Sequence, residues 1–550
     1  MEKKFRFLML TLSLLTAAVP SELLFAAGGK GSGDFRIVPL PKTFNVTAKS
    51  AALPSGSVQL NDFAAGMFTA EMAYLGRTVD VTETAGEKFR CIWGTVDESR
   101  LEQALENVKS RTGGYILQIT ADGIGIASAE KQGLYYGLQS LLQLLEQSTD
   151  NKLPVCTVED WPDFAFCGFH QALRPPKAYS LDSMEQTVEM YKWLIRRLAR
   201  YKYTHLCLMT KGTLAFESYP ELEMGPWTGK EVQQLLRFAA DRGIAVFPEV
   251  KTMGKFFESM PVQNGMESFA DLLERRKYIG QLDYQAQYHA GYGQRAAQLE
   301  EEQKALEKEQ NAVAKISEDF KITDPAVFEF LRPVLDEVYD MFGQPEFFHI
   351  GCDESFYIAI NEPAEERGPL MAAYINHVAE YLQAKGCKVM MWDDMLVSHE
   401  QFPYFFEAHG GPPLNTWTAV ETLNKDIVLA CWHYGYTVAG HYPQNYSMIG
   451  WLADKGFQVI GVPWFKEDGI LNMIRNVKEA NGMGMMGSAW ALHQTVRCTL
   501  GTLTNNAVSG RKEMAIFAAT AEAAWSPENA ATVLEQYDAE AWEKRWLKKD

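Results

Sequence analysis

The chain has 550 residues, 47% of them hydrophobic and 22% charged, and its formal net charge is −18 at pH 7. The length predicts about two or three domains, and the composition is that of an ordinary globular protein with a sizeable core. The negative charge argues against nucleic acid or an anionic membrane surface as a partner, and it leaves open a neutral ligand such as a sugar.

The first segment has the order of a secretory signal peptide. Lys3, Lys4 and Arg6 precede an apolar stretch over 7–19, and small residues follow at 26–29. Basic, apolar and small residues in this order are typical of a secretory signal, and the apolar run is too short to favour a transmembrane helix. We therefore predict a signal peptide over residues 1–27 and a secreted or periplasmic protein.

A small α+β domain is predicted over residues 34–160. Ala121-Asp122-Gly123 is a favourable hairpin turn between two apolar runs. Apolar runs and helical spacing predict strands over 89–95, 115–120 and 124–128 and helices over 98–110 and 134–145.

From residue 161 to about residue 530 the pattern changes to alternating strands and helices. Eight strands with intervening helices predict a (β/α)8 TIM barrel, and an open doubly wound sheet is the alternative. The predicted strands are 166–172, 204–209, 245–250, 347–351, 388–392, 427–432, 458–463 and 485–489.

A charged, alanine-rich insertion over about 285–325 separates the third and fourth barrel strands. Within residues 294–319 an apolar residue recurs every seven positions, but the second heptad core position carries glutamine. A solvated helical arm is therefore favoured over a coiled coil. Residues 531–550 are predicted to form a C-terminal helix.

The eight cysteines are scattered singly along the chain. A disulfide framework needs a higher density and regular local spacing, so we predict buried, unpaired cysteines. Neither CxxC nor HExxH spacing occurs, and the sequence therefore predicts no metal site and no cofactor.

Two adjacent carboxylates, Asp353 and Glu354, follow the fourth predicted barrel strand. Enzymes built on this barrel carry their catalytic groups at the carboxyl ends of the strands. A pair of carboxyl groups can divide acid–base chemistry when one of them is neutral and the other is ionised. The alternative is a helix N-terminus capped by Asp353 or Ser355.

The sequence around this pair resembles glycoside hydrolase family 20, the β-N-acetylhexosaminidases. The family signature, an apolar strand followed by His-x-Gly-Gly-Asp-Glu, stands here as His349-Ile350-Gly351-Cys352-Asp353-Glu354. Further similarity lies in the small N-terminal domain, at the entry to the barrel, in the third strand and in the final helix, so that the resemblance extends from Ile37 to Trp525.

The resemblance implies removal of terminal β-linked N-acetylhexosamine by substrate-assisted retaining catalysis, in which the sugar's own acetamido oxygen attacks the anomeric carbon. Glu354 would protonate the leaving oxygen and later deprotonate water. Asp353 would orient the acetamido N–H and stabilise the positively charged intermediate.

The resemblance also implies an arginine that holds sugar hydroxyls, tryptophans that stack on the sugar, and a tyrosine that donates to the acetamido carbonyl. The substrate-binding residues implied in this way are Arg174, His349, Trp392, Trp432, Tyr434 and Trp490.

Several positions depart from the family pattern. The second strand carries Cys207, Met209 and Gly212 where the family has a His pair and an Asp. Pro-Gly-His after the third strand becomes Met253-Gly254-Lys255, and Trp-x-Glu at the eighth becomes Trp490-Ala491-Leu492. A divergent member is therefore predicted. The alternatives are a glycosidase for another or decorated amino sugar, a non-catalytic glycan-binding protein, and an assembly protein that uses the helical insertion.

Overall fold

The computed structural model describes residues 35–256, 319–434, 446–489 and 518–528, apart from 87, 149, 180, 211, 221–224, 357, 360–361, 404, 406 and 465–466. The predicted signal peptide, most of the predicted helical insertion, the predicted C-terminal helix, Trp490 and Leu492 lie outside the described residues.

A seven-stranded sheet forms the first folded part, in the order β1-β7-β5-β6-β4-β2-β3. Neighbouring strands are antiparallel except β2 and β3. The strands are β1 (Thr43–Ala52), β2 (Val58–Asn61), β3 (Val81–Thr84), β4 (Phe89–Gly94), β5 (Tyr115–Ile119), β6 (Gly123–Ser128) and β7 (Lys152–Asp160), and the helices are α2 (Asp62–Tyr74), α3 (Glu98–Leu105) and α4 (Lys131–Gln147).

Alternating side chains of β5 cover both faces of this sheet, because neighbouring residues in a strand point to opposite sides. Ile116 packs with Leu101 of α3, whereas Leu117 belongs to the larger apolar cluster that includes Leu138 of α4. The predicted hairpin is confirmed, since β5 and β6 pair in antiparallel register up to Ile119 and Ile124.

Eight parallel strands form the second part and close into a barrel, in the order β10-β11-β12-β13-β14-β15-β8-β9. The predicted (β/α)8 TIM barrel preceded by a small α+β domain is confirmed, and the open doubly wound sheet is wrong. The strands are β8 (Phe166–Ala172), β9 (His205–Met209), β10 (Ala245–Glu249), β11 (Phe347–His349), β12 (Lys388–Trp392), β13 (Val428–Cys431), β14 (Val459–Gly461) and β15 (Gly484–Ser488).

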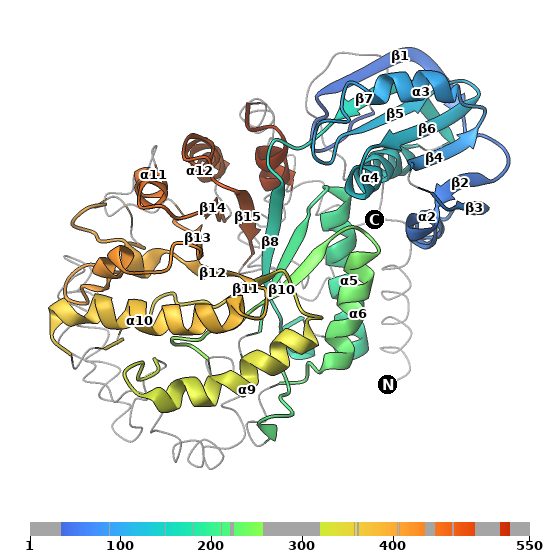
Figure 1. Ribbon diagram of the computed structural model, residues 1–550. Coiled ribbons are helices and arrows are strands. Elements are labelled where there is room, and N and C mark those ends of the chain that lie inside the picture. The colour runs from blue at the N-terminus through green and yellow to red at the C-terminus, as the bar shows by residue number, and fades with distance from the viewer. Residues whose placement is uncertain are drawn as a thin grey trace, which may run out of the picture.

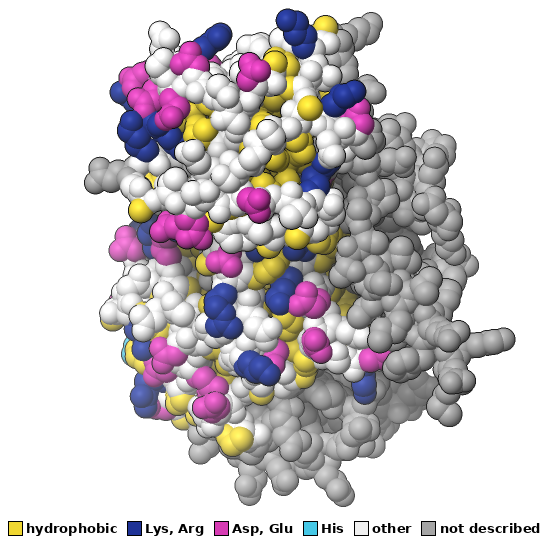
Figure 2. Space-filling view, turned by 90° about the vertical axis from the view of Figure 1, so that its right-hand side faces the viewer, with side chains coloured by type: hydrophobic (Ala, Val, Ile, Leu, Met, Phe, Trp, Pro, Cys, Tyr) yellow, Lys and Arg dark blue, Asp and Glu magenta, His cyan; other side chains and the backbone are white. Residues whose placement is uncertain are grey.

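Helices surround the barrel strands (Figure 1). They are α5 (Met184–Arg200), α6 (Gly229–Ala240), α9 (Pro325–Met341), α10 (Ala364–Gln383), α11 (Ser447–Asp454) and α12 (Glu467–Glu479), with short 3-10 segments η2 (Pro176–Tyr179), η5 (Asp394–Leu396) and η6 (Thr416–Glu421). None of the described helices is both long and apolar enough to span a bilayer. On the face shown in Figure 2, acidic and basic side chains are interspersed.

Large apolar side chains fill the barrel interior. Phe347 of β11 packs inside with Phe166 and Phe247, while its neighbour Phe348 faces the surrounding helices. Because the interior is packed, polar groups that act on a ligand are expected at the carboxyl ends of the strands.

Glu71 of α2 joins the first part to the barrel helices. It is buried, and it pairs with Arg196 at 3.0 Å, with Arg200 at 3.0 Å and with Arg242. Burial alone would raise the pKa of Glu71, but the three arginines together lower it to about 2. The carboxylate therefore stays ionised at the junction.

A second buried group lies between β7 and the helical segment 518–525. Asp160 accepts hydrogen bonds from Lys202 at 2.8 Å and from the indole of Trp525 at 2.7 Å. Nearby, one oxygen of Glu522 accepts from the backbone N–H of Leu40 at 2.8 Å, and its other oxygen has no partner among the described residues. Burial, and to a lesser degree Asp160, raises the pKa of Glu522 from its ordinary value of 4.5 to about 8.

Glu522→Gln is expected to stabilise the protein at alkaline pH. Because the folded state binds this proton more tightly, its contribution to stability is present below pH 4.5 and is lost as the pH rises towards 8. Glutamine removes the buried charge, and we expect the free energy of unfolding to exceed that of the wild type by roughly 1–3 kcal/mol at pH 9. Denaturant unfolding at pH 4 and pH 9 measures this. An equal difference at both pH values would contradict it.

Candidate active site

The Asp353–Glu354 pair lies in a loop at the carboxyl end of β11. Neighbouring strands hold this loop: the Ile350 N–H donates to Met390 at 2.8 Å, and the Trp392 N–H donates to Gly351 at 3.0 Å. Among the described residues of this loop no helix begins at the pair, and α10 starts at Ala364. The capping alternative is therefore wrong.

Gly351 and Cys352 give the loop its sharp path. Both have φ values of 72°, in the left-handed region that favours glycine. At Gly351 a Cβ atom would lie 2.8 Å from Cδ of Lys251, so this position has room only for glycine. Cys352, which replaces the second signature glycine, is buried and its thiol donates to Ile350 at 3.5 Å. Its side chain therefore fills core.

Two lysines that follow β10 contact the acid pair. Lys251 Nζ lies 2.6 Å from Oδ1 of Asp353, and Lys255 Nζ lies 3.4 Å from its Oδ2. Lys255 also forms an ion pair with Glu354. The Asp353 side chain is 11% exposed and that of Glu354 is 35% exposed, so Glu354 is the acid that reaches solvent.

Asp353 is held in its ionised form. Burial opposes its charge, but Lys251 and then Lys255 hold the pKa of Asp353 well below its usual range. The same contacts raise the pKa of both lysines despite their burial, so both ammonium groups stay protonated. The site therefore contains a fixed negative charge close to a more exposed carboxyl group.

Glu249, at the end of β10, lies beneath this pair and has no exposed surface. Its Oε1 contacts Nζ of Lys251 at 2.6 Å and accepts from the indole of Trp392 at 2.7 Å, and its Oε2 accepts from His170 at 2.6 Å. Burial would raise the pKa of Glu249, but Lys251 and the hydrogen bond from His170 hold it well below its ordinary value.

Asp394 connects the acid loop to an aromatic side chain. Its Oδ2 accepts from the backbone N–H of Glu354 at 2.9 Å and from His409 at 2.9 Å. Its Oδ1 accepts from the indole of Trp432 at 3.1 Å. Burial raises the pKa of Asp394, and the charge of Asp353 adds to this shift, while His409 opposes it.

The sugar-binding residues predicted at the strand ends differ in exposure. Trp432 is half-buried and packs edge-on against Tyr434, with 5.1 Å between ring centroids. Arg174 follows β8 and is half-buried, and its Nε has no hydrogen-bond partner among the described residues. Trp392 is 2% exposed and His349 is fully buried, so both support the site from within the barrel.

His349 helps to fix the backbone of the signature loop, residues 349–354. Its Nδ1 accepts the N–H of Gly351 at 3.0 Å, and its ring packs on Trp392. Burial lowers the pKa of His349 to about 3, so the ring is neutral.

Tyr434 lies 3.4 Å from the Ser488 hydroxyl and packs on Trp464.

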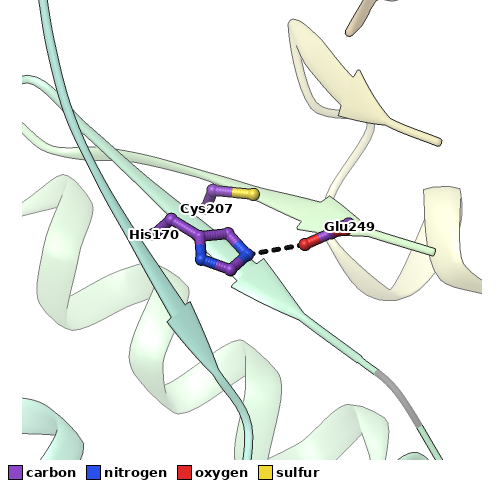
Figure 3. Close-up of side chains that lie close together, drawn as sticks. All are labelled: His170, Cys207 and Glu249. Carbon is purple, nitrogen blue, oxygen red and sulfur yellow. Dashed lines mark hydrogen bonds and ion pairs between the residues drawn. The ribbon is translucent and has the colours of Figure 1, made fainter. Parts of the chain in front are cut away.

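His170, Cys207 and Glu249 form a group with possible metal-ligand atoms within 4.8 Å of one another (Figure 3). A metal would require the thiolate, but burial and then Glu249 raise the pKa of Cys207 well above its ordinary value. Both oxygens of Glu249 already have protein partners. These contacts account for the group without an ion, and we assign it no metal.

Models of one enzyme family match the chain in two places. They are "Glycosyl hydrolase family 20, domain 2" over residues 34–161 and "Glycosyl hydrolase family 20, catalytic domain" over residues 197–451. Together the two matches span well over half of the chain, and the second contains Asp353 and Glu354. The chain belongs to glycoside hydrolase family 20.

Two curated relatives are distant from this chain in sequence. A β-hexosaminidase of Porphyromonas gingivalis is 24% identical over 322 residues, which cover 52% of this chain and 36% of the relative. One from Vibrio furnissii is 23% identical over 394 residues, covering 64% of this chain and 55% of the relative. The chain thus spans about half or less of the length of these curated relatives.

Solved family 20 structures share the fold. An exo β-N-acetylglucosaminidase of Vibrio harveyi in complex with N-acetylglucosamine has a TM-score of 0.58 at 16% identity, covering 96% of this chain and 81% of that one. The N-acetyl-β-hexosaminidase of Streptomyces plicatus has a TM-score of 0.57 at 16% identity, covering 93% of each chain. At this identity the likeness shows the fold alone.

Sequence reasoning missed most of the polar groups that support the acid pair of this family 20 protein. Asp393 and Asp394 directly follow β12, so the strand-end rule that found Asp353 and Glu354 also applied to them. Asp393 is buried and accepts from His433 at 2.8 Å. Lys251 carried no comparable signal, because its partner Asp353 lies 102 residues further along the chain.

Proposed function

We propose that the chain is an exo-acting glycoside hydrolase that removes terminal β-linked N-acetylhexosamine with retention of configuration. The observation that carries the proposal is the adjacent pair at the barrel mouth, in which an ionised Asp353, with a side chain only 11% exposed, lies beside the more exposed Glu354. The family 20 catalytic-domain match supports the substrate class, as do relatives named β-hexosaminidases.

Asp353 has the properties required to stabilise a cationic intermediate. When the acetamido oxygen attacks the anomeric carbon, positive charge develops on the sugar and on the acetamido group. A carboxylate fixed nearby stabilises that charge without reorganising, and it accepts the acetamido N–H. Asp353 needs no covalent bond to the sugar in this route.

Glu354 transfers the protons. In the first step its carboxyl group donates a proton to the leaving oxygen, and in the second its carboxylate takes one from water. The hydrogen bond from its backbone N–H to Asp394 fixes the main chain, while its side chain reaches solvent. Lys255 must move away from the Glu354 carboxyl group before that group donates its proton.

A decorated or otherwise different amino sugar is the second candidate substrate. The observation that favours it is the pair of ammonium groups, those of Lys251 and Lys255, that contact the acid pair. Lys255 belongs to Met253-Gly254-Lys255, and the family carries Pro-Gly-His at these three positions. Such a change in charge alters which sugar substituents the site tolerates.

We also propose that the enzyme is secreted or periplasmic. The proposal rests on the basic, apolar and small segments of residues 1–27. Fractionation of native host cells, followed by intact-mass analysis of the protein, tests it. We expect the protein in the periplasm or the medium without its N-terminal segment. Recovery from the cytoplasm with the full N-terminal segment would contradict the proposal.

A panel of aryl β-glycosides that differ at C2 and C4 tests the activity. We expect turnover of 2-acetamido glycosides to exceed that of the 2-hydroxy counterparts by about 10³-fold or more, because the latter lack the internal nucleophile. The double variant Asp353→Asn/Glu354→Gln, prepared in parallel, controls for contaminating hydrolases. Equal turnover of 2-hydroxy and 2-acetamido glycosides, or no turnover of any glycoside, would contradict the proposal.

A further inference from the structure

The ammonium group of Lys251 lies between two carboxylates. It is 2.6 Å from Oε1 of Glu249 and 2.6 Å from Oδ1 of Asp353, and its side chain is 2% exposed. Moving a lysine ammonium group from water into the core costs free energy, and contacts with carboxylates must offset that cost.

The backbone around Lys251 is fixed on both sides by the signature loop. The Val250 N–H donates to His349 at 2.9 Å, and the Thr252 N–H donates to Ile350 at 3.1 Å. The Thr252 hydroxyl donates to the same Ile350 carbonyl at 2.8 Å. Lys251 therefore starts from a rigid position, and its ammonium group holds Asp353 from a fixed point.

The two oxygens of Asp353 are consequently not equivalent. Oδ1 has the short contact with buried Lys251, whereas among the described residues Oδ2 contacts only the more exposed Lys255, at 3.4 Å. We propose that Lys251 is a positioning residue that fixes Asp353 through Oδ1 and leaves Oδ2 to accept the acetamido N–H. This inference rests on the proposed function.

The negative charge of Glu249 offsets the positive charge of Lys251. An ammonium group paired with Asp353 alone would cancel the negative charge that faces the cationic intermediate. With Glu249 on its other side, the group of three carries a net charge of −1, and Trp392 and His170 hold Glu249 in place. Asp353 thus gains a fixed orientation while the group keeps its attraction for positive charge.

A double-mutant cycle between Lys251→Met and Asp353→Asn tests the inference. We expect Lys251→Met to lower kcat/KM on a 2-acetamido aryl glycoside by about 10²-fold, because Asp353 loses its orientation. In the Asp353→Asn background the same substitution is expected to change kcat/KM by no more than about twofold. The inhibition constant of a thiazoline analogue of the cyclised sugar should follow the same pattern. Equal losses in both backgrounds would overturn the inference.

A second variant separates positioning from mere neutralisation of Glu249, and it covers the case in which Lys251→Met alone does not fold. Glu249→Gln/Lys251→Met removes both charges together. If Lys251 only neutralised Glu249, this double variant would regain wild-type kcat/KM, and the inference would be overturned. If Lys251 positions Asp353, the loss of about 10²-fold remains in the folded double variant.

Lys388→Met is the matched control, because Lys388 forms an exposed ion pair with Glu346 at 2.9 Å at the amino end of β12. It should keep wild-type kcat/KM. Absence of 2-acetamido turnover in the wild type would overturn the proposed function and the inference together. Additive losses in an active enzyme would overturn the inference alone.

Discussion

Asp353→Asn is expected to lower kcat/KM on 2-acetamido aryl glycosides by about 10²- to 10³-fold, the scale on which loss of one preorganised electrostatic group acts. Asparagine keeps the shape of the side chain but removes the charge that opposes the developing cation. Its NH₂ group would also face an ammonium group, since Lys251 and Lys255 contact the two oxygens of Asp353. KM should change less than kcat, because the charge develops only after binding.

Trapping experiments on the wild type decide which nucleophile acts. If the acetamido oxygen attacks, a thiazoline analogue should inhibit tightly, as ligands that resemble the intermediate do, and its affinity should fall in Asp353→Asn. A 2-fluoro glycoside, which traps enzyme nucleophiles, should leave the intact mass unchanged. A stable glycosyl adduct on Asp353 or another carboxylate would rule out the substrate-assisted route.

The barrel could be predicted from sequence because its strands are buried on both faces and therefore appear as short apolar runs. Phe347 and Phe348 are adjacent, yet one fills the interior and the other packs against helices. Runs of this kind mark a strand directly, and all eight predicted strands overlap the observed ones.

The first sheet was harder to predict. β1 has mostly exposed or half-buried residues and lies at one edge of the sheet, so its sequence lacks a clear apolar alternation. α2 buries a single face, but that face includes Glu71, and Gly66, Ala70 and Ala73 lie on its exposed face, so its sequence lacks a clear contrast between an apolar and a polar side. β2, β3 and β7 were also missing from the prediction.

The candidate site was predictable where local pattern carries the chemistry. Asp353 and Glu354 are adjacent and follow an apolar strand, so a short motif shows them. The contacts of Glu249 with Lys251 and Trp392 depend instead on how distant strands meet. Trp392 lies 143 residues from Glu249 along the chain, and only barrel closure brings the two side chains together.

Glu354→Gln is expected to lower turnover by about 10²-fold or more on substrates with poor leaving groups, the usual scale of general acid catalysis. Activated aryl glycosides should lose much less in the first step, because their leaving oxygen departs with little protonation. Glutamine keeps the backbone hydrogen bond to Asp394, so the loop should retain its position.

A series of aryl glycosides with graded leaving-group pKa values measures this dependence, with log kcat/KM plotted for wild type and variant. The slope should be steeper in Glu354→Gln, since the leaving oxygen there carries its full negative charge. Glu346→Gln is the matched control, because Glu346 is 58% exposed and lies beside Lys388 at the opposite end of the barrel strands. Equal losses across the whole series would assign Glu354 a role other than proton donor, because only a group that protonates the leaving oxygen matters most when that oxygen is a poor leaving group.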